Sequence, residues 1–436
     1  MSDEMPPKPV RRRRVFYIPG YDPIHPRRYR ELYRTESAKQ AQIAGYEIGI
    51  APRPGVETYG WKVASKIDGG ATLAEVDVLV WSDIVRDSMS NSIPATYLQL
   101  VRTAWTYIAS GTLRRLMWMR KGPVIAALYP VGMLLLQLAL AVFVAWIPAK
   151  IIEMLTPLIA LPFVQLAGLV GLGPDGILNV AWVVGLVLGF VSWFVWIFGV
   201  VWLLRWFKSK DNKLYAYYLM HDYAYSARYN GVNPKPLEQR MAVFGDQIAA
   251  ALDDNLDEVL VVGHSSGAHL AVSIIADLLR AGRVPTDGPT LSFLSLGQVV
   301  PMVSFLPNAY RLRNDLAFMA VQEQVAWVDV TAPGDGCSFA LCDPVAVTGV
   351  APPGQHWPLI LSAAFTQTLS PETWKELRWR FFRLHFQYLC AFDRPKDYDY
   401  FKITAGPLTL ADRYRERHSS KSRIDVPASK YTSLHP

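Results

Sequence analysis

The sequence predicts an α/β protein in which a mostly parallel central sheet, flanked by helices, is interrupted by a transmembrane helical hairpin. Two observations carry this prediction. Strand-like runs alternate with helical stretches on both sides of a long apolar region, and this alternation is typical of a parallel sheet covered by helices. Hydrophobic residues make up 51% of the 436 residues and charged residues only 19%, and the apolar excess is concentrated between Gly122 and Leu204.

The part of the chain before the apolar region contains four expected strands. Val15–Ile18 is an apolar run that enters a Pro-Gly-Tyr-Asp-Pro turn, and an arginine-rich helical stretch follows it. Val76–Trp81 is a β-branched run of the kind found in buried strands. Gly45–Ala51 and Glu57–Ser65 are the other two expected strands.

Three stretches of the apolar region contain no charged side chain, and they are Gly122–Ala149, Met154–Pro174 and Gly176–Leu204. Crossing about 30 Å of hydrocarbon takes roughly 20 apolar residues. The first and third stretches are therefore expected to be transmembrane helices. The middle stretch contains Pro157, Pro162 and several glycines, which favour a broken, interfacial or re-entrant segment, although its length also allows a span.

Basic residues predict how the hairpin is oriented. Those on the two outer flanks are Arg114, Arg115, Arg120, Lys121, Arg205, Lys208, Lys210 and Lys213, and Lys150 is the only one between them. Positive charge stays on the cytoplasmic side, so both flanks and both termini are expected in the cytoplasm, beneath the inner or plasma membrane. Strands from both flanks are expected in one sheet, which also requires an even number of spans.

The net charge of +7 does not point to a nucleic-acid partner, because the sequence has neither zinc-finger spacing nor an aromatic-basic RNA-binding motif. The basic residues suit anionic lipid headgroups instead, so the expected partner is the membrane bilayer. Met1–Arg14 is charged and has no apolar core, which excludes a cleavable signal peptide. Cys337, Cys342 and Cys390 cannot all pair within one chain and match no metal-site spacing, which favours reduced cytoplasmic thiols.

After the apolar region, expected strands and helices alternate. The elements are a helix over Pro236–Asp253, a strand over Glu258–Val262, a helix over Ala268–Arg280, a strand over Leu291–Leu296, helical sequence over Asn308–Ala320 and a strand over Gln324–Val330. The polar segment Ser419–Pro436 is expected to be a disordered tail. Residues 1–121 and 207–418 would thus form one soluble domain around a hairpin region at 122–206, with the tail at 419–436.

One short motif carries chemistry. Gly263–Gly267 reads Gly-His-Ser-Ser-Gly and matches G-x-S-x-G between a valine-rich strand and an apolar helix. A strained turn in this context projects the hydroxyl of Ser265, and the small residues around it allow the chain to turn without a clash. The following helix points its N-terminus at developing negative charge. A purely structural Gly-Ser turn is the alternative interpretation.

In this context the motif resembles the nucleophile elbow of the α/β-hydrolase family, which includes serine esterases and lipases. The resemblance implies that Ser265 is the nucleophile and that the Ser266 backbone N–H donates to the oxyanion. Ile18–Tyr21 resembles the loop after the family's third strand, which implies the Tyr21 backbone N–H as the second donor, although a proline stands where the family more often has histidine. The membrane insertion is not part of the common family pattern.

The family's triad runs Ser, then Asp or Glu, then His along the chain, so the acid is expected after the next-to-last strand. Asp335 lies in the loop that follows Gln324–Val330 and is the expected acid. Asp329, inside that strand, and Asp343, in the sequence beyond Asp335, remain alternatives because chain order alone does not define geometry.

Eight histidines compete for the role of general base. Six precede the motif, lie in or beside its turn, or belong to the tail region, and these are His25, His221, His264, His269, His418 and His435. His356 lies in a Pro-Gly loop typical of a surface turn. His385 follows Trp379–Leu384, which is interpreted as the last strand, and a histidine leaving the last strand matches the family's base. A histidine packed among aromatic side chains is the alternative.

Together these features imply a membrane-anchored serine hydrolase that cleaves an ester or thioester through a Ser-His-Asp triad and an acyl-enzyme. Its position beside the bilayer favours a lipid-derived or acylated substrate, and no metal or organic cofactor is implied. A catalytically inactive hydrolase-fold scaffold or binding protein is the alternative, since fold does not imply function. A transporter is disfavoured because the expected spans contain few polar side chains, chiefly Gln137, Asn179 and Ser192.

Overall fold

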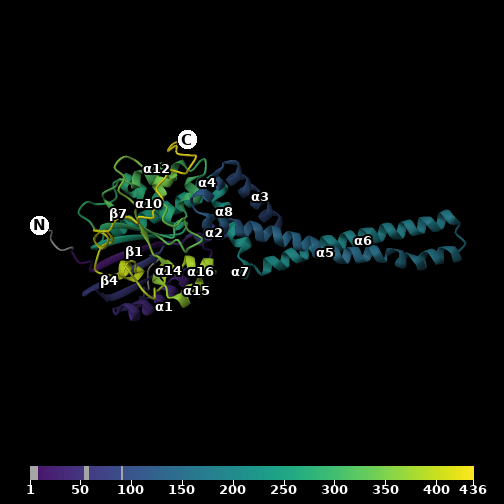
Figure 1. Ribbon diagram of the computed structural model, residues 1–436, viewed down its shortest axis with the longest axis horizontal. Coiled ribbons are helices and arrows are strands. Elements are labelled where there is room, and N and C mark those ends of the chain that lie inside the picture. Colours follow the sequence, from purple (N-terminus) through teal and green to yellow (C-terminus); the bar gives the residue numbers. More distant parts are fainter. Residues whose placement is uncertain (1–7, 54–57, 90–91) are drawn as a thin grey trace. The chain divides into compact units, whose positions relative to one another are not determined.

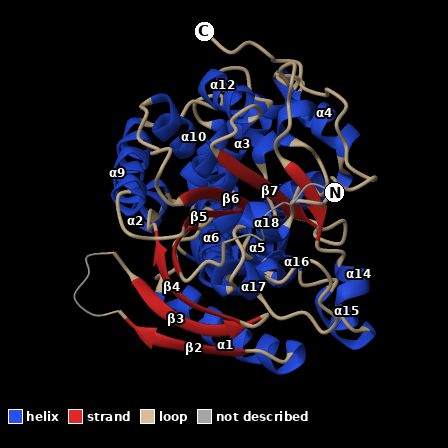
Figure 2. Ribbon diagram, turned by 90° about the vertical axis from the view of Figure 1, so that its left-hand side faces the viewer, coloured by secondary structure: helices blue, strands red, loops and turns tan. Residues whose placement is uncertain are grey.

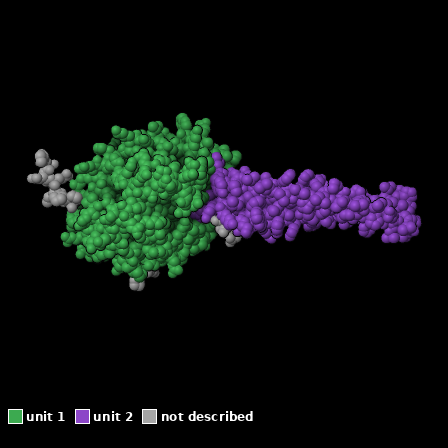
Figure 3. All heavy atoms as spheres, turned by 60° about the horizontal axis from the view of Figure 1, so that its bottom comes forward, with its two compact units in different colours: residues 1–89, 101–127, 222–436 green, residues 90–100, 128–221 purple. Residues whose placement is uncertain are grey.

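The computed structural model of the protein describes residues 8–53, 58–89 and 92–436. Over these residues it is an α/β structure with an eight-stranded mixed sheet (Figure 2) and two long apolar helices. The chain divides into unit 1, residues 1–89, 101–127 and 222–436, and unit 2, residues 90–100 and 128–221 (Figure 3). The start of the basic segment Met1–Arg14, and Glu57 at the start of one expected strand, lie outside the described residues.

The sheet combines strands from both sides of the hairpin. Its strands are β1 (Arg12–Ile18), β2 (Glu47–Pro52), β3 (Gly60–Ile67), β4 (Gly70–Val78), β5 (Glu258–His264), β6 (Thr290–Leu296), β7 (Val325–Thr331) and β8 (Leu359–Ser362), in the spatial order β2-β3-β4-β1-β5-β6-β7-β8. β1 pairs in parallel with β4 and with β5, so Val15 lies between Val76 and Leu260. The pairs β2–β3 and β3–β4 are antiparallel, whereas β5 to β8 pair in parallel.

The central strands are buried because helices cover both faces of the sheet. β5 and β7 are buried over their whole length, which explains their nearly continuous apolar sequences. The helix α10 (Gly267–Arg280) contacts β1, β5 and β6. Tyr29 and Tyr33 of α1 (Arg27–Ala44) pack into one apolar cluster with Val15 and Tyr17 of β1. The end of β5 therefore lies in a fully buried part of the sheet.

Shorter helices complete unit 1 and its junctions with the hairpin. They are α2 (Ser82–Ser88), α3 (Ile93–Ala109), α4 (Thr112–Met119), α7 (Asp211–Leu214), α8 (Ala216–Ala227), α9 (Lys235–Leu252), α11 (Val300–Ser304), α12 (Tyr310–Met319), α13 (Pro344–Thr348), α14 (Phe365–Thr368), α15 (Pro371–Leu377), α16 (Phe381–His385), the 3₁₀ helix η1 (Gln387–Leu389), α17 (Tyr400–Ala405) and α18 (Leu410–Arg413). The strands expected from the sequence are present with shifted ends, except the one over Trp379–Leu384, where the chain is helical, and β8 was not expected.

Two helices among the described residues are long and apolar enough to cross a membrane, α5 (Lys121–Leu169) and α6 (Pro174–Ser209). They run side by side as a hairpin (Figure 1). The Ser192 hydroxyl of α6 donates to the Ala149 carbonyl of α5 at 2.9 Å, and Gly199 lies against Ala145. With 49 residues, α5 is about 73 Å long, more than twice the thickness of the hydrocarbon layer. The hairpin is therefore long enough to reach beyond the hydrocarbon.

A broken segment was expected within Met154–Pro174, and for residues up to Leu169 this expectation is wrong. α5 continues as a helix through Pro157 and Pro162. A helix pairs most of its own backbone groups, whereas a broken segment in apolar surroundings would leave them unpaired, so prolines are tolerated within such a helix. The chain reverses only after Leu169, before α6 begins at Pro174. The prolines alone were therefore a poor guide to where the first helix ends.

The segment Ser419–Pro436, expected to be disordered, instead lies along unit 1. The Ile424 amide donates to the Leu341 carbonyl at 2.7 Å, and the Ile424 carbonyl accepts from the Asp343 amide at 2.8 Å. The buried Arg313 guanidinium donates to the Ser433 carbonyl at 2.6 Å. Backbone hydrogen bonds and one buried arginine hold this segment, which a polar and aperiodic sequence does not reveal.

Candidate active site

The turn Gly263–Gly267 connects β5 to α10 and places Ser265 at the end of the buried strand. Ser265 has a φ angle of 57°, in the left-handed region that residues with side chains rarely adopt. Its amide donates to the Leu296 carbonyl at 2.9 Å, and its side chain is half-buried. Strained backbone of this kind concentrates at functional sites, so the conformation marks Ser265 as a functional candidate.

Two glycines allow the loop after β1 to lie against this turn. A Cβ atom on Gly267 would lie 2.1 Å from the Ile18 carbonyl oxygen, a distance that no other residue allows. A Cβ atom on Gly20 would lie 3.0 Å from the Ser265 Cβ atom. The loop that ends at Tyr21 therefore lies beside the serine, where the sequence resemblance expects an oxyanion donor.

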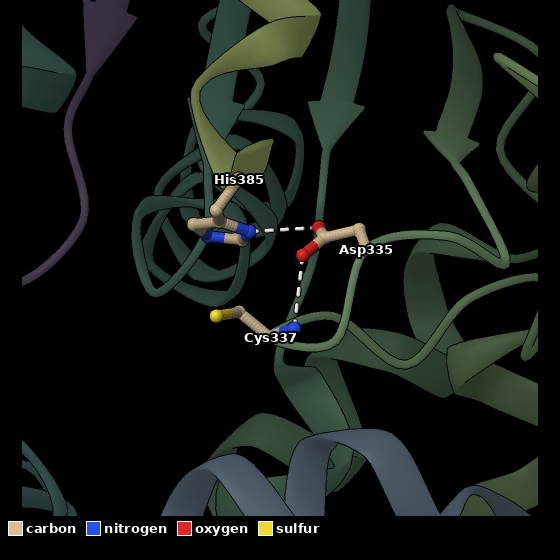
Figure 4. A group of neighbouring side chains, drawn as sticks. All are labelled: Asp335, Cys337 and His385. Carbon is tan, nitrogen blue, oxygen red and sulfur yellow. Dashed lines mark hydrogen bonds and ion pairs between the residues drawn. The ribbon is translucent and has the colours of Figure 1, made fainter. Parts of the chain in front are cut away.

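Asp335 follows β7 and is almost completely buried, with 2% of its surface exposed. Its Oδ2 atom accepts from His385 Nδ1 at 2.8 Å, and its Oδ1 atom accepts from the Cys337 amide at 2.9 Å (Figure 4). Oδ2 also accepts from the Tyr388 hydroxyl at 3.0 Å. Burial alone would raise the pKa of Asp335, but the charge and hydrogen bond of His385, together with hydrogen bonds from the Cys337 amide and the Ser338 side chain, outweigh it and leave the pKa below its usual value. The carboxyl group is therefore ionised at neutral pH.

His385 is the last residue of the helix α16, so the expected strand over Trp379–Leu384 is wrong. Arg380 forms an (i, i+4) ion pair with the exposed Glu376 at 3.0 Å, whereas Leu384 and His385 point inward. The histidine still reaches the end of the sheet, but a helix carries it there.

The imidazole of His385 lies beside the serine turn. A Cβ atom on Gly297 would lie 3.0 Å from His385 Cε1, and the preceding residue, Leu296, accepts the Ser265 amide hydrogen bond. Nδ1 is engaged with Asp335, whereas Nε2 is buried and has no hydrogen-bond partner among the described residues. The hydrogen bond between the hydroxyl and the imidazole of a catalytic serine–histidine pair often forms only when substrate is bound. The nitrogen that faces away from Asp335 can therefore accept a proton.

The two other candidate acids are not in contact with His385. Asp329 points into the sheet, where its Oδ1 atom accepts from the Ser295 hydroxyl at 2.5 Å, and burial raises its pKa to about 8. Asp343 caps the helix α13 by accepting from two backbone amides of its first turn. Of the three candidates, the structure thus brings only Asp335 to the histidine.

His356, the other candidate base, lies in the exposed turn that the sequence predicts. Its ring nitrogens lie 3.3 Å from the Gly354 carbonyl and 3.4 Å from the Gln322 carbonyl. These weak surface contacts give His356 no part in the buried pair.

His264 is a positioning residue that sequence reasoning set aside. Its Nε2 atom lies 3.0 Å from the His385 carbonyl oxygen, and the centroids of the two rings are 4.9 Å apart. Burial first, and then the neighbouring His385, lower the pKa of His264 to about 3, so it is neutral and donates to that carbonyl. The sequence could have indicated this role, because His264 directly precedes Ser265 in the motif. A side chain at that position packs against the residues that lie over the turn.

One group in the described part of the chain has the side chains to hold a metal ion, namely Asp335, Cys337 and His385, whose ligand atoms lie within 4.8 Å of one another (Figure 4). Both oxygens of Asp335 already accept hydrogen bonds, and His385 Nδ1 donates one of them. Burial also raises the pKa of the Cys337 thiol, which disfavours the thiolate that a metal needs. The arrangement suits proton transfer better than metal binding.

The chemistry of this site follows from its own geometry: a strained serine, a buried aspartate–histidine pair, and a backbone loop packed against the serine. An ionised carboxylate that orients an imidazole beside a hydroxyl can activate that hydroxyl as a nucleophile. When the chain was compared with protein-family models, curated proteins and solved structures, no match was found.

Proposed function

We propose that the chain is a membrane-anchored serine hydrolase of the α/β-hydrolase type that cleaves an ester or thioester. The observation that carries the proposal is the buried hydrogen bond between His385 and Asp335 beside the strained turn of Ser265. The three residues follow the order Ser, Asp, His along the chain, as in the α/β hydrolases. In one departure from the family, the loop that resembles its third-strand loop follows β1, the first strand of this chain.

In this mechanism the Ser265 hydroxyl attacks the substrate carbonyl while His385 Nε2 takes its proton. The tetrahedral oxyanion accepts hydrogen bonds from the Ser266 and Tyr21 backbone N–H groups. Collapse of the intermediate breaks the ester bond, and His385 returns the proton to the departing alcohol or thiol. Water, activated by the same histidine, then hydrolyses the acyl-enzyme, and Asp335 holds the imidazole in the required orientation throughout.

The membrane anchor follows from the apolar hairpin. α5 and α6 are long and apolar enough to span, and basic residues lie at the outer end of each. Since strands from both flanks form one sheet, both flanks must lie on the same side of the bilayer. We assign that side to the cytoplasm by the positive-inside rule. A catalytic domain held there favours an acylated or lipid-derived substrate.

The test is hydrolysis of a short-chain acyl ester by the full-length protein purified in detergent. Ser265→Ala and His385→Ala should each lower kcat/KM by several orders of magnitude, because triad members act as a unit. His356→Ala, a histidine on the surface, is the matched control and should retain wild-type activity. Activity of Ser265→Ala within about tenfold of wild type would exclude Ser265 as the nucleophile. Folded wild type without any activity would favour the inactive scaffold.

A further inference from the structure

A pocket lies in unit 1 next to the serine turn. Tyr21 and Ser266, whose backbone N–H groups are the proposed oxyanion donors, both line it. Asp222, Tyr225 and His269 also line it and take no part in the mechanism above. A substrate whose carbonyl reached the oxyanion donors would extend its next atoms into this pocket.

Three polar side chains of this pocket have unpaired groups. Asp222 forms no hydrogen bond or salt bridge within the described part of the chain, and only burial and the charge of His385 act on its carboxyl group. The Tyr225 hydroxyl and His269 Nδ1 are buried without a hydrogen-bond partner among the described residues, and only 8% of His269 is exposed. Buried polar groups are almost always paired in folded proteins, so two unpaired ones beside the unpaired carboxyl group of the half-buried Asp222 point to a ligand.

The charges around the pocket define what that ligand carries. No lysine or arginine is among the residues that line it, and Asp222 is its only acidic residue. Burial lowers the pKa of His269 to about 4, so this histidine is neutral and its unprotonated nitrogen accepts a hydrogen bond. An anionic group would therefore meet a carboxyl group and no compensating cation, whereas a group that donates hydrogen bonds would find two acceptors.

Aromatic side chains make up another part of the lining. The rings of Tyr21, Trp81 and Tyr225 pack against one another, with centroids 5.6 to 6.2 Å apart. Aromatic rings attract cations, and they also pack against the carbon atoms of an alcohol. Both properties suit a small organic group that carries a hydroxyl or an ammonium.

We propose that this pocket binds the alcohol part of the ester and selects alcohols that donate hydrogen bonds, through hydroxyl or ammonium groups, to Asp222 and His269. The inference rests on the proposed hydrolase function and specifies its substrate class. An apolar acyl chain would leave these polar groups unpaired, so the acyl chain must lie elsewhere. Burial raises the pKa of Asp222 to about 7 while the charge on His385 opposes the shift, so a donor from the substrate would stabilise the carboxylate.

The test uses four butyrate esters that differ only in the alcohol: propyl, 2-hydroxyethyl, 2-(dimethylamino)ethyl and carboxymethyl. We expect the wild type to have a higher kcat/KM for the hydroxyethyl and dimethylaminoethyl esters than for the propyl ester, by about tenfold or more, and a lower one for the carboxymethyl ester. Asp222→Asn should lower the ratio of the donor-bearing esters to the propyl ester through KM. Asp246→Asn, which changes an exposed carboxylate, is the matched control and should leave all ratios unchanged.

The four esters also separate the two sources of the donor. If Asp222→Asn loses the preference over the propyl ester only for the dimethylaminoethyl ester, Asp222 recognises an ammonium. If it loses the preference for both the hydroxyethyl and the dimethylaminoethyl ester, Asp222 recognises a hydrogen-bond donor regardless of charge. Tyr225→Phe provides a second variant if Asp222→Asn does not fold, because removing an unpaired hydroxyl does not destabilise the fold. It should lower the hydroxyethyl-to-propyl ratio.

Unchanged ratios in both variants would overturn the inference about the pocket. If all four esters were hydrolysed equally well in a reaction that requires Ser265, only this inference would fail. If hydrolysis did not require Ser265, the proposed function itself would fail.

Discussion

His385 Nδ1 donates a 2.8 Å hydrogen bond to Asp335 Oδ2, joining two segments fifty residues apart in the chain. In the neutral form of the imidazole, the bond places the proton on Nδ1 and leaves Nε2 as the acceptor. The Tyr388 hydroxyl and the Cys337 amide hold the carboxylate from two other directions. The aspartate is therefore oriented by several contacts and in turn fixes the histidine.

This relationship predicts that Asp335→Asn inactivates the enzyme. An asparagine amide can donate to Nδ1 and stabilise the wrong imidazole tautomer, so kcat should fall by about 10⁴-fold, as in other triads. Steady-state ester hydrolysis measures the loss. Asp343→Asn, at a helix cap that keeps its oxygen acceptor, is the control and should remain active. A double variant with His385→Ala should be scarcely slower than the single histidine variant, and additive losses would show that the two residues act independently.

The backbone strain at Ser265 predicts a trade between stability and activity. Glycine adopts a φ angle near 57° without the steric cost that a side chain brings, so Ser265→Gly should stabilise the fold by about 1 kcal/mol. Ser265→Ala keeps the strain and should show no such gain, although both variants lose activity. Thermal unfolding in detergent compares the three proteins. A less stable Ser265→Gly would mean that the serine side chain supports the fold.

Asp329 predicts a pH-dependent contribution to stability. Burial raises its pKa to about 8, so between about pH 4 and 8 the folded chain holds a proton that the unfolded chain releases. Its stabilising contribution is complete below about pH 4 and is lost as the pH rises through about 8. The asparagine of Asp329→Asn cannot ionise. As the pH rises from about 4 to 8, the free energy of unfolding of the variant minus that of the wild type should therefore increase by up to about 1.4 kcal/mol per pH unit.

Chemical denaturation of Asp329→Asn and wild type at pH 5, 6.5 and 8 measures this difference. The variant should also keep its esterase activity, because Asp329 does not contact His385. A difference in unfolding free energy that stays constant with pH would show that Asp329 is ionised in the folded protein throughout.

The proposed topology predicts which positions an impermeant thiol reagent reaches on intact cells. Single cysteines at Asp87, Asp175 and Ser422, all exposed in the structure, are placed in a background lacking Cys337, Cys342 and Cys390. Only the cysteine at Asp175, in the first turn of α6, should be labelled, and all three should react in permeabilised cells. Different labelling of Asp87 and Ser422 would place the two flanks on opposite sides and contradict a single domain built from both.

Local patterns in the sequence predicted the features that depend on neighbouring residues. The valine-rich strand, the Gly-His-Ser-Ser-Gly turn and the apolar helix after it form the connection from β5 to α10. Asp335 was expected in the loop after β7, which is where it lies, because chain order and turn residues mark such loops. The sheet contains strands from both flanks of the apolar region, as expected, although it is mixed.

Features that depend on distant contacts were missed. His385 is carried by a helix, and the difference from a strand lies in which side chains are buried by distant parts of the chain. His264 was set aside as too close to Ser265, yet it holds the His385 carbonyl across 121 residues of sequence. Asp222 lies near the serine turn only because folding brings α8 to the loop after β1, and its neighbours in the sequence do not indicate this. The segment after Ser419 is held by partners from several parts of unit 1, so its own composition carries no signal.

In the proposed mechanism Ser265 is a nucleophile activated by His385 and Asp335. The most direct measurement is the reaction of the full-length protein with a fluorophosphonate probe, followed by mass-spectrometric mapping of the modified peptide. We expect a single adduct on Ser265 of the wild type, none in Ser265→Ala, slow labelling in His385→Ala and normal labelling in His356→Ala. An adduct on another serine, or equal labelling of wild type and Ser265→Ala, would contradict this mechanism.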